Sequence, residues 1–554
     1  MAENKGFDRR WAIGGGAALA LGGAYLALKP GAGGNSGGHF KPEPGTFYRG
    51  NAAEPFTLDP SLTDASWEDP IVGDMMIGLT TGDAHGNPLP GMAASWQSSA
   101  DGLTWTFKLR DAAWSDGVPV TADDFLFAWR HTLAPATAAN YAYFLYIVKN
   151  AQAVNTGKMP PTALGARAID PQTLEVTLNH PAPYLLQMLM HTSMMPQPRH
   201  VVEKLGKDWT RPGHYVCNGP FRLTEWVPND HITVVKNPRF YDAANVSLKK
   251  IIFYPTSDYG AALRRLRAGE LDAQDRMENN QYGWIKANMP ELLDQVPQLI
   301  VDLITVNQTR KPFDDIRVRR AINLAINREA ITDKIIRVGY VPAYNVVPPR
   351  TANFAAGNVF DFKSMDYDRR LAEARALMGQ AGFGPDKRLR FSYMIRNTSP
   401  GYYRAVAAAL QQMFAQIYLD ITIAPTDAQI FYKTIQEHDF DMAQPGWQGD
   451  FNDASNFLDL FRTGGGNNWG NYANPEFDRL FDEAQHEVDI ESRARKLSAA
   501  EQVLLKDEVC MPLFFWVSGN LVRPYLKGWV ANNMDVHRSR WMTIDEKARA
   551  AIFT

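Results

Sequence analysis

The sequence predicts a mixed α/β protein made of several layered sheet–helix domains. Segments with alternating polar and apolar residues, typical of half-buried strands, are interleaved with amphipathic helices that begin at capping residues. The chain has 554 residues and no repeat period. At about 150 residues per domain this length predicts three or four domains, which is ample for large buried cores. A layered α/β architecture accommodates this order of elements.

Five segments are expected to form strands. Residues 104–109 (TWTFKL) show the clearest alternation, because every second side chain is apolar. Residues 173–178 (TLEVTL) repeat this pattern. The other three segments are residues 231–235, 251–254 and 389–395. Each is expected to turn one face toward a hydrophobic core and the other toward solvent.

Capping residues mark four expected helix starts. At the first of them, Thr121 and Asp124 fit a capping box, in which each side chain bonds to the other residue's backbone N–H group. Apolar residues three or four positions apart then define the buried face of each helix. The expected starts, with their inward-facing residues, are Thr121 with Phe125 and Trp129; Asp314–Asp315 with Val318, Ile322, Ala325 and Ile326; Asp366 with Leu371, Ala374 and Leu377; and Asn474, with Pro475 at the first helical position.

Residues 1–38 are predicted to be a signal or anchor segment followed by a Gly-rich linker. Arg9 and Arg10 precede an uncharged run over residues 11–28, which is the layout of a secretory signal and resembles a twin-arginine signal. Five glycines in the run lower its quality as a membrane-spanning helix, although its length is near the minimum for a span. A cleaved signal and a retained inner-membrane anchor are both open, and either one predicts a periplasmic location.

Charge and cysteine content exclude several classes of protein. A net charge of −3 gives no reason to expect nucleic acid as a partner. The two cysteines, Cys217 and Cys510, are too few for a disulfide scaffold or a Cys-based zinc site. They could form one disulfide in an exported protein or stay as two buried thiols, and the sequence leaves both open.

The sequence also lacks the usual patterns of enzyme and cofactor sites. No phosphate loop or dinucleotide fingerprint follows a strand, and the 11 histidines include no His-x-x-x-His pair. No combination of nucleophile, base and oxyanion donors is visible. We therefore expect no catalytic residue, no metal and no cofactor.

Six segments, in a common order and spacing, carry a family resemblance over nearly the whole chain after residue 38. They are residues 49–60 (RGNAAEPFTLDP), 101–130, 218–242, 264–272, 309–331 and 440–458 (FDMAQPGWQGDFNDASNFL). In these segments the chain resembles the periplasmic oligopeptide- and dipeptide-binding proteins of ABC transporters, extracellular solute-binding protein family 5. The similarity is greatest to the oligopeptide branch.

The resemblance implies a bilobed periplasmic-binding-protein fold of type II, cluster C. Such a fold has two lobes, a hinge between them and an extra domain on the first lobe. By alignment, lobe I would be discontinuous and would include the C-terminus. The implied boundaries are residues 39–76, 199–298 and 517–554 for lobe I, 77–198 for the additional domain, and 299–516 for the ligand-binding lobe.

The resemblance also implies a specific peptide anchor. In the family, an Asp three residues after a Gly-Trp pair holds the α-ammonium group of the peptide. Here the run from Gly446 and Trp447 places Asp450 at that position. An ammonium group that leaves water needs a carboxylate in hydrogen-bonding contact, or its desolvation would oppose binding. The alternative is that Asp450 caps a helix beginning near Ser455.

Other residues are placed in the peptide site by the same resemblance. Tyr141 matches a tyrosine that lines the cleft, Asp64 matches an acidic residue of the first lobe, and Trp447 would form an aromatic wall unless it is simply buried in a core. Two positions depart from the oligopeptide branch: Gln444 stands where an Arg can occur and Tyr402 where a His can occur. The predicted peptide-binding set is Asp450, Trp447, Gly446, Tyr141, Asp64, Asn452, Gln444 and Tyr402.

The implied function is capture of short peptides outside the cytoplasmic membrane and their delivery to the permease subunits of an ABC transporter. The peptide would bind in an extended form, with its backbone paired to strand edges and its side chains in hydrated pockets. We expect a monomer that performs no catalysis. Three alternatives stay open: the same fold with a non-peptide solute such as a murein peptide, haem or a metal complex; a peptide sensor or chaperone; and an exported hydrolase.

Overall fold

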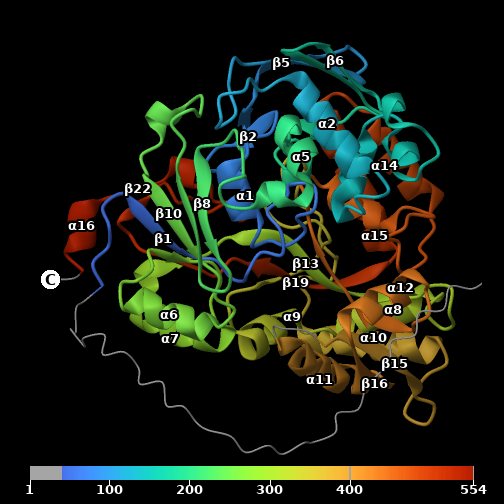
Figure 1. The fold of residues 1–554 in the computed structure, drawn as a ribbon. Coiled ribbons are helices and arrows are strands. Elements are labelled where there is room, and N and C mark those ends of the chain that lie inside the picture. The colour runs from blue at the N-terminus through green and yellow to red at the C-terminus, as the bar shows by residue number, and fades with distance from the viewer. Residues whose placement is uncertain (1–39, 398–400, 553–554) are drawn as a thin grey trace, which may run out of the picture. The chain divides into compact units, whose positions relative to one another are not determined.

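Three larger sheets organise the part of the chain that the computed structural model describes, residues 40–397 and 401–552 (Figure 1). The signal, anchor and linker predictions for residues 1–38 lie outside these residues. Two of the sheets have seven strands and the third has four. Within the same residues, no helix is long and apolar enough to cross a membrane.

The first seven-stranded sheet is assembled from segments that are far apart in the sequence. Its order is β12 (Leu293–Asp294), β20 (Asn520–Val522), β11 (Ala273–Gln274), β1 (Thr46–Gly50), β10 (Lys250–Tyr254), β9 (His231–Lys236) and β8 (Phe221–Val227). The central strand β1 pairs in parallel with β10 and β11, whereas β8, β9 and β10 form an antiparallel meander. The strands predicted over residues 231–235 and 251–254 are therefore confirmed as β9 and β10.

The four-stranded sheet is antiparallel and lies within residues 93–177. Its order is β4 (Ala93–Ser98), β5 (Thr104–Leu109), β7 (Thr173–Thr177) and β6 (Ala166–Asp170). The predicted bounds of β5 are confirmed. Helix α2 (Ala122–Leu133) begins with the predicted capping box of Thr121 and Asp124, and its Phe125 and Trp129 are buried. One hydrophobic core runs from this sheet to the first one.

The second seven-stranded sheet has a separate hydrophobic core. Its order is β14 (Val341–Pro342), β19 (Cys510–Val517), β13 (Pro297–Val306), β17 (Met442–Gln444), β15 (Leu389–Arg396) and β16 (Leu419–Thr426), with β18 (Gly446–Gln448) also paired to β13. Strand β13 is long because it pairs with β19 along one edge and with both β17 and β18 along the other. In Figure 1, β13 and β19 lie near the centre of the picture.

The predicted helix caps of this region are confirmed. Asp315 accepts a hydrogen bond from Arg317 N, Asp366 from Asp368 N, and Asn474 from Glu476 N. These residues begin α8 (Ile316–Ala325), α10 (Tyr367–Gln380) and α14 (Pro475–Gln485). The prediction that Leu377 points inward is wrong: it is half-buried, and the next residue, Met378, is fully buried instead. Met378 lies four residues after the buried Ala374 and so continues the same helix face.

The remaining elements are shorter or join the sheets. The helices are α1 (Asp69–Met75), α3 (Ala151–Asn155), α4 (Leu185–Met188), α5 (Arg199–Leu205), α6 (Tyr259–Arg267), α7 (Tyr282–Asn288), α9 (Arg328–Ala330), α11 (Tyr402–Ala415), α12 (Ala428–Gln436), α13 (Ser455–Leu458), α15 (Ile490–Lys506) and α16 (Glu546–Ala550). The strands are β2 (Thr80–Gly82) with β3 (Pro88–Pro90), and β21 (Leu526–Lys527) with β22 (Thr543–Ile544).

The strands of the three larger sheets can be compared with the predicted domain boundaries. Every strand of the first sheet falls in the segments predicted for lobe I, and every strand of the four-stranded sheet falls in residues 77–198. The second seven-stranded sheet begins with β13 at Pro297, two residues before the predicted start of the ligand-binding lobe. The exact boundaries stay a prediction.

The two cysteines belong to different cores. Cys217 is buried in the first core and Cys510 in the second, and both are free thiols. Burial raises the pKa of Cys217 to about 12, so this thiol is not reactive at neutral pH. The sequence leaves open either one disulfide or two buried thiols, and the structure has two buried thiols.

Candidate functional site

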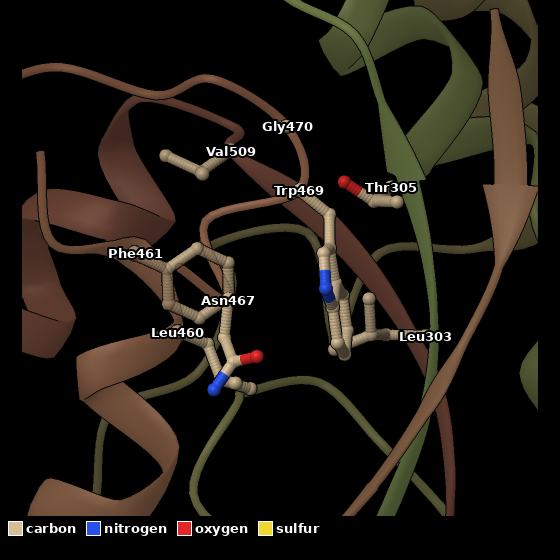
Figure 2. Close-up of a pocket in the computed structure, with 8 residues that line it drawn as sticks. All are labelled: Leu303, Thr305, Leu460, Phe461, Asn467, Trp469, Gly470 and Val509. Atoms are coloured by element: carbon tan, nitrogen blue, oxygen red, sulfur yellow. The ribbon is translucent and has the colours of Figure 1, made fainter. Parts of the chain in front are cut away.

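A large cleft is lined by residues from both seven-stranded sheets and contains most of the predicted site residues. Its volume is about 1870 Å³, and both hydrophobic cores contribute residues to its wall. Figure 2 shows a second, much smaller cavity inside the second core, where Phe461 and Trp469 face each other. That cavity has a volume of about 10 Å³, which is close to the minimum for one water molecule. The cleft is therefore the candidate site for an organic ligand.

Asp450 lies on the wall of this cleft, just after strand β18. The strand ladder continues to Gly449, whose N–H donates to Leu299 O at 2.7 Å. A Cβ atom on Gly449 would approach the Phe457 ring to 3.0 Å, so a glycine fits best at this close contact. The Asp450 side chain is half-buried. The strand and the glycine thus present this carboxylate to the cleft.

Two tyrosines of the short helical segment Asn140–Ile147 bind the Asp450 carboxylate. Tyr143 donates its hydroxyl hydrogen to Oδ2 at 3.0 Å, and Tyr141 donates to Oδ1 at 3.4 Å. Their rings stack on each other, with centroids 5.4 Å apart. Within residues 40–397 and 401–552, no Lys or Arg forms an ion pair with Asp450. Among the described residues the carboxylate therefore has neutral hydrogen-bond donors but no countercharge.

The environment of Asp450 raises its pKa to about 6, because burial disfavours the charged form more strongly than the two tyrosine hydrogen bonds favour it. Burial and the nearby carboxylate also raise the pKa of both tyrosines, so both hydroxyls remain protonated donors. Near pH 7 Asp450 therefore carries a negative charge that no cation within the described residues pairs with. A cationic group that enters the cleft would supply the missing charge.

The alternative role of Asp450, as a helix cap, is wrong. Helix α13 begins at Ser455, and Asp453 accepts the hydrogen bond from Ser455 N at 3.0 Å. Asp453 also forms a buried ion pair with Arg493. A different carboxylate therefore performs the local structural role, which leaves Asp450 available to a ligand.

Trp447 and Gly446 lie in β18 and line the cleft. Trp447 is half-buried: its indole N–H donates to Asn456 Oδ1 at 2.8 Å, and its ring meets the edge of Trp469 at 6.1 Å. The ring therefore packs on the second core and also forms part of the cleft wall. The two interpretations of this residue, cleft wall and core packing, are not exclusive.

The remaining predicted residues fall into two groups. Asp64, which is exposed and accepts a hydrogen bond from Asn140, and the buried Tyr402 both line the cleft. Gln444 and Asn452 are not among the residues that line it. Gln444 is fully buried in β17 and accepts from Tyr393, and Asn452 accepts from Ala352 N. Both residues are close to Asp450 in sequence but lie outside the cleft lining, and Gln444 Nε2 is buried with no hydrogen-bond partner among the described residues.

Several residues of the cleft were missed by sequence reasoning. Tyr143 binds Asp450 from 307 positions away in the chain, and no local pattern indicates such a contact. A second group is a polar cluster formed by Asp302, Arg396, Tyr403, Tyr432 and Trp516. One signal for this cluster was available, because Asp302 interrupts an otherwise apolar run, and a charge in a buried strand normally has a partner.

Two sheet-based lobes around a large cleft, with an uncompensated carboxylate on its wall, define a bilobed solute-binding protein. The chain belongs to the bacterial extracellular solute-binding proteins of family 5: the family model described as "Bacterial extracellular solute-binding proteins, family 5 Middle" matches residues 87–469. The expected fold class and family are thereby confirmed. Members of this family are solute-binding proteins of transporters rather than enzymes.

Known relatives match over nearly the whole chain. The periplasmic oligopeptide-binding protein OppA of Salmonella typhimurium is 33% identical over 492 residues, which cover 88% of this chain and 90% of that protein. The open, unliganded structure of the periplasmic murein tripeptide-binding protein MppA has a TM-score of 0.81 and 31% identity, and it covers 91% of this chain and 98% of that one. The structure of Haemophilus influenzae OppA in complex with RPPGFSPFR has a TM-score of 0.75 and 32% identity. It covers 91% of this chain and 99% of that one.

Proposed function

We propose that this protein binds short peptides outside the cytoplasmic membrane and delivers them to the permease subunits of an ABC transporter. The observation that carries the proposal is Asp450, a half-buried carboxylate in a cleft that has two tyrosine donors and no cationic partner within the described residues. The α-ammonium group of a peptide has the charge and the donors that this carboxylate lacks.

The cleft also offers a strand edge to an extended ligand. Among the described strands, β18 pairs only with β13, and Gly446, Trp447, Gln448 and Gly449 all line the cleft. A peptide that added to this edge would gain backbone hydrogen bonds that do not depend on its side chains. Ammonium binding at Asp450 would fix the register of the peptide along the strand. This combination suits a protein that accepts many peptide sequences.

We further propose a periplasmic monomer that performs no catalysis. The relative OppA of Salmonella typhimurium is a periplasmic protein, which supports this location. A membrane tether would depend on residues 1–38, which lie outside the described part of the chain. In the proposed cycle the two lobes close around the peptide, and the membrane subunits bind the closed form.

A direct test measures peptide binding by titration calorimetry. Trialanine with a free N-terminus is expected to bind, whereas N-acetyl-trialanine, which has lost its positive charge, is expected to bind at least about 30-fold more weakly. Equal binding of the two peptides would refute the role of the ammonium group. Absence of binding by a mixed library of tripeptides and tetrapeptides would refute the proposed function itself.

Peptide affinity is also expected to fall about tenfold between pH 7 and pH 5. The ligand-free pKa of Asp450 is raised to about 6, so the carboxylate is mostly protonated at pH 5 and must lose its proton before it can hold an ammonium group. The peptide amino group, with a pKa of about 8, stays charged throughout this range. Calorimetry at pH 7, 6 and 5 measures the effect. The Asp450→Asn protein should show no such dependence, and a flat profile in the unsubstituted protein would contradict the assignment.

A murein peptide is a second candidate ligand, because the open MppA structure is similar to this chain with a TM-score of 0.81. Native mass spectrometry of the purified protein would distinguish the two candidates by the mass of any ligand that is carried through purification. A ligand without an amino group, such as haem or a metal complex, would leave the charge of Asp450 without a partner and is disfavoured for that reason.

A further inference from the structure

Arg396 is a second charged group on the cleft wall, at the opposite end of β18 from Asp450. It is the last residue of β15, which pairs in parallel with β17 so that Ile395 lies opposite Gln444. Arg396 therefore lies beside the turn that leads into Gly446. A Cβ atom on Gly446 would be only 2.9 Å from Arg396 Nη2, so the guanidinium packs directly against the first residue of β18.

A buried carboxylate and two tyrosines hold this guanidinium in place. Asp302, which is fully buried, lies 3.3 Å from Nη2 and is itself bound by the Trp516 indole N–H at 2.6 Å. Tyr432 accepts from Nη1 at 3.2 Å, and Tyr403 accepts from Nη2. The orientation of Arg396 is therefore fixed before any ligand binds, which lowers the entropic cost of binding to it.

Arg396 has N–H bonds that lack a hydrogen-bond partner among the described residues. A guanidinium has five N–H bonds, and the partners above accept three of them. Its Nε is buried and has no hydrogen-bond partner within the described ranges. The side chain is 16% exposed, and Arg396 lines the cleft together with Tyr432, Tyr402 and Trp516. Planar donors on a rigid cation suit a carboxylate.

We infer that Arg396 binds the C-terminal carboxylate of the peptide and, with Asp450, sets its length to three or four residues. The inference rests on the proposed function. Gly446 and Asp450 are four residues apart in extended chain, which spans roughly 13 Å at about 3.3 Å per residue. An extended tripeptide or tetrapeptide measures roughly 10 to 13 Å between its charged ends. The relative from Haemophilus influenzae holds a peptide of nine residues, so a length limit would distinguish this protein from it.

The first test uses the unsubstituted protein and synthetic alanine peptides of two to six residues, each with a free or an amidated C-terminus. Affinity should be highest at three or four residues. At that length the free acid should bind about 10- to 100-fold more tightly than the amide, as expected for a charge-assisted hydrogen bond. An optimum outside three to four residues, or equal binding of acid and amide, would overturn the inference.

A paired substitution then tests Arg396 itself. Arg396→Gln alone would leave the Asp302 carboxylate buried without a partner, so the variant Arg396→Gln/Asp302→Asn removes both charges together. It should lose the preference for the free acid and still bind the tripeptide amide. The matched control is Arg369→Gln, because Arg369 is an exposed cation of α10 that does not line the cleft and forms no ion pair among the described residues. The control should keep the preference.

These outcomes separate the inference from the proposed function. If the acid and the amide of the tripeptide bind equally well, peptide binding is supported and the role of Arg396 is refuted. If neither peptide binds, the proposed function is refuted. If the paired variant keeps the preference for the free acid while its thermal unfolding matches that of the unsubstituted protein, another cation holds the carboxylate and the inference is overturned.

Discussion

Replacement of Asp450 with Asn is expected to weaken the binding of a tripeptide with a free N-terminus by about 30- to 1,000-fold, which corresponds to about 2 to 4 kcal/mol. Asn has nearly the same volume, and its carbonyl oxygen can still accept from Tyr143. It cannot, however, supply the charge that an ammonium group needs once this group has left water. Because Asp450 has no cationic partner in the described structure, the substitution does not leave a protein cation unpaired.

The matched control is Asp333→Asn. Asp333 is another carboxylate that lines the cleft, but it is exposed and lies on the helical segment 331–336 rather than beside β18. Its removal changes the net charge of the protein equally and should alter affinity by no more than about twofold, as expected for a solvent-screened charge. Similar losses in the two variants would mean that general electrostatic attraction, rather than contact at Asp450, binds the peptide.

A double-mutant cycle makes this test stricter. If Asp450 contacts the ammonium group, N-acetylation of the peptide and the Asp450→Asn substitution remove the same interaction. The loss from both changes together should then be close to the loss from either one alone. Losses that simply add in free energy would show that Asp450 affects binding from elsewhere, for example through the position of Tyr141.

The local structure of this protein was largely predictable because its signals are local. Alternation over residues 104–109 marks β5 at its true bounds, and the capping residues Asp366 and Asn474 begin helices where expected. A cap depends only on the next two or three residues of the chain. The inward face of α10 was assigned less well at its end, because Leu377 and Met378 are both apolar and the choice between them depends on what packs against the helix.

The site was predictable at the individual positions that the family resemblance supplied, which include Tyr141, Asp64 and Tyr402 as well as one short run. Gly446, Trp447 and Asp450 occur in a single run, and all of them reach the cleft. The environment that determines the charge state of Asp450 comes from Tyr141 and Tyr143, about 300 positions earlier in the chain. The orientation of Arg396 likewise depends on Asp302. Contacts of this kind depend on how distant strands are paired, which periodicity and capping do not reveal.

The segment that carries Asp450 is fixed to the protein by the ion pair of Asp453 and Arg493. Both side chains are fully buried, and two hydrogen bonds of 2.7 and 2.8 Å join them. The Arg493 guanidinium lies 5.0 Å from the Tyr184 ring centre, and Tyr184 in turn stacks on Phe451 at 4.9 Å. The pair therefore supports a contact between the second core and Tyr184 of the first core, one residue away from Asp450.

Asp453→Ala is accordingly expected to lower the free energy of unfolding by about 3 to 5 kcal/mol, because it leaves the Arg493 charge buried and unpaired. The paired variant Asp453→Leu/Arg493→Met removes both charges and fills the space, so it should lose much less. Urea unfolding of the ligand-free proteins, followed by circular dichroism, measures both. Equal losses in the two variants would show that packing around these residues, rather than the unpaired charge, determines stability.

Because Asp453 holds the segment that presents Asp450 to the cleft, the single variant should also bind the tripeptide more weakly. The paired variant should recover most of that affinity.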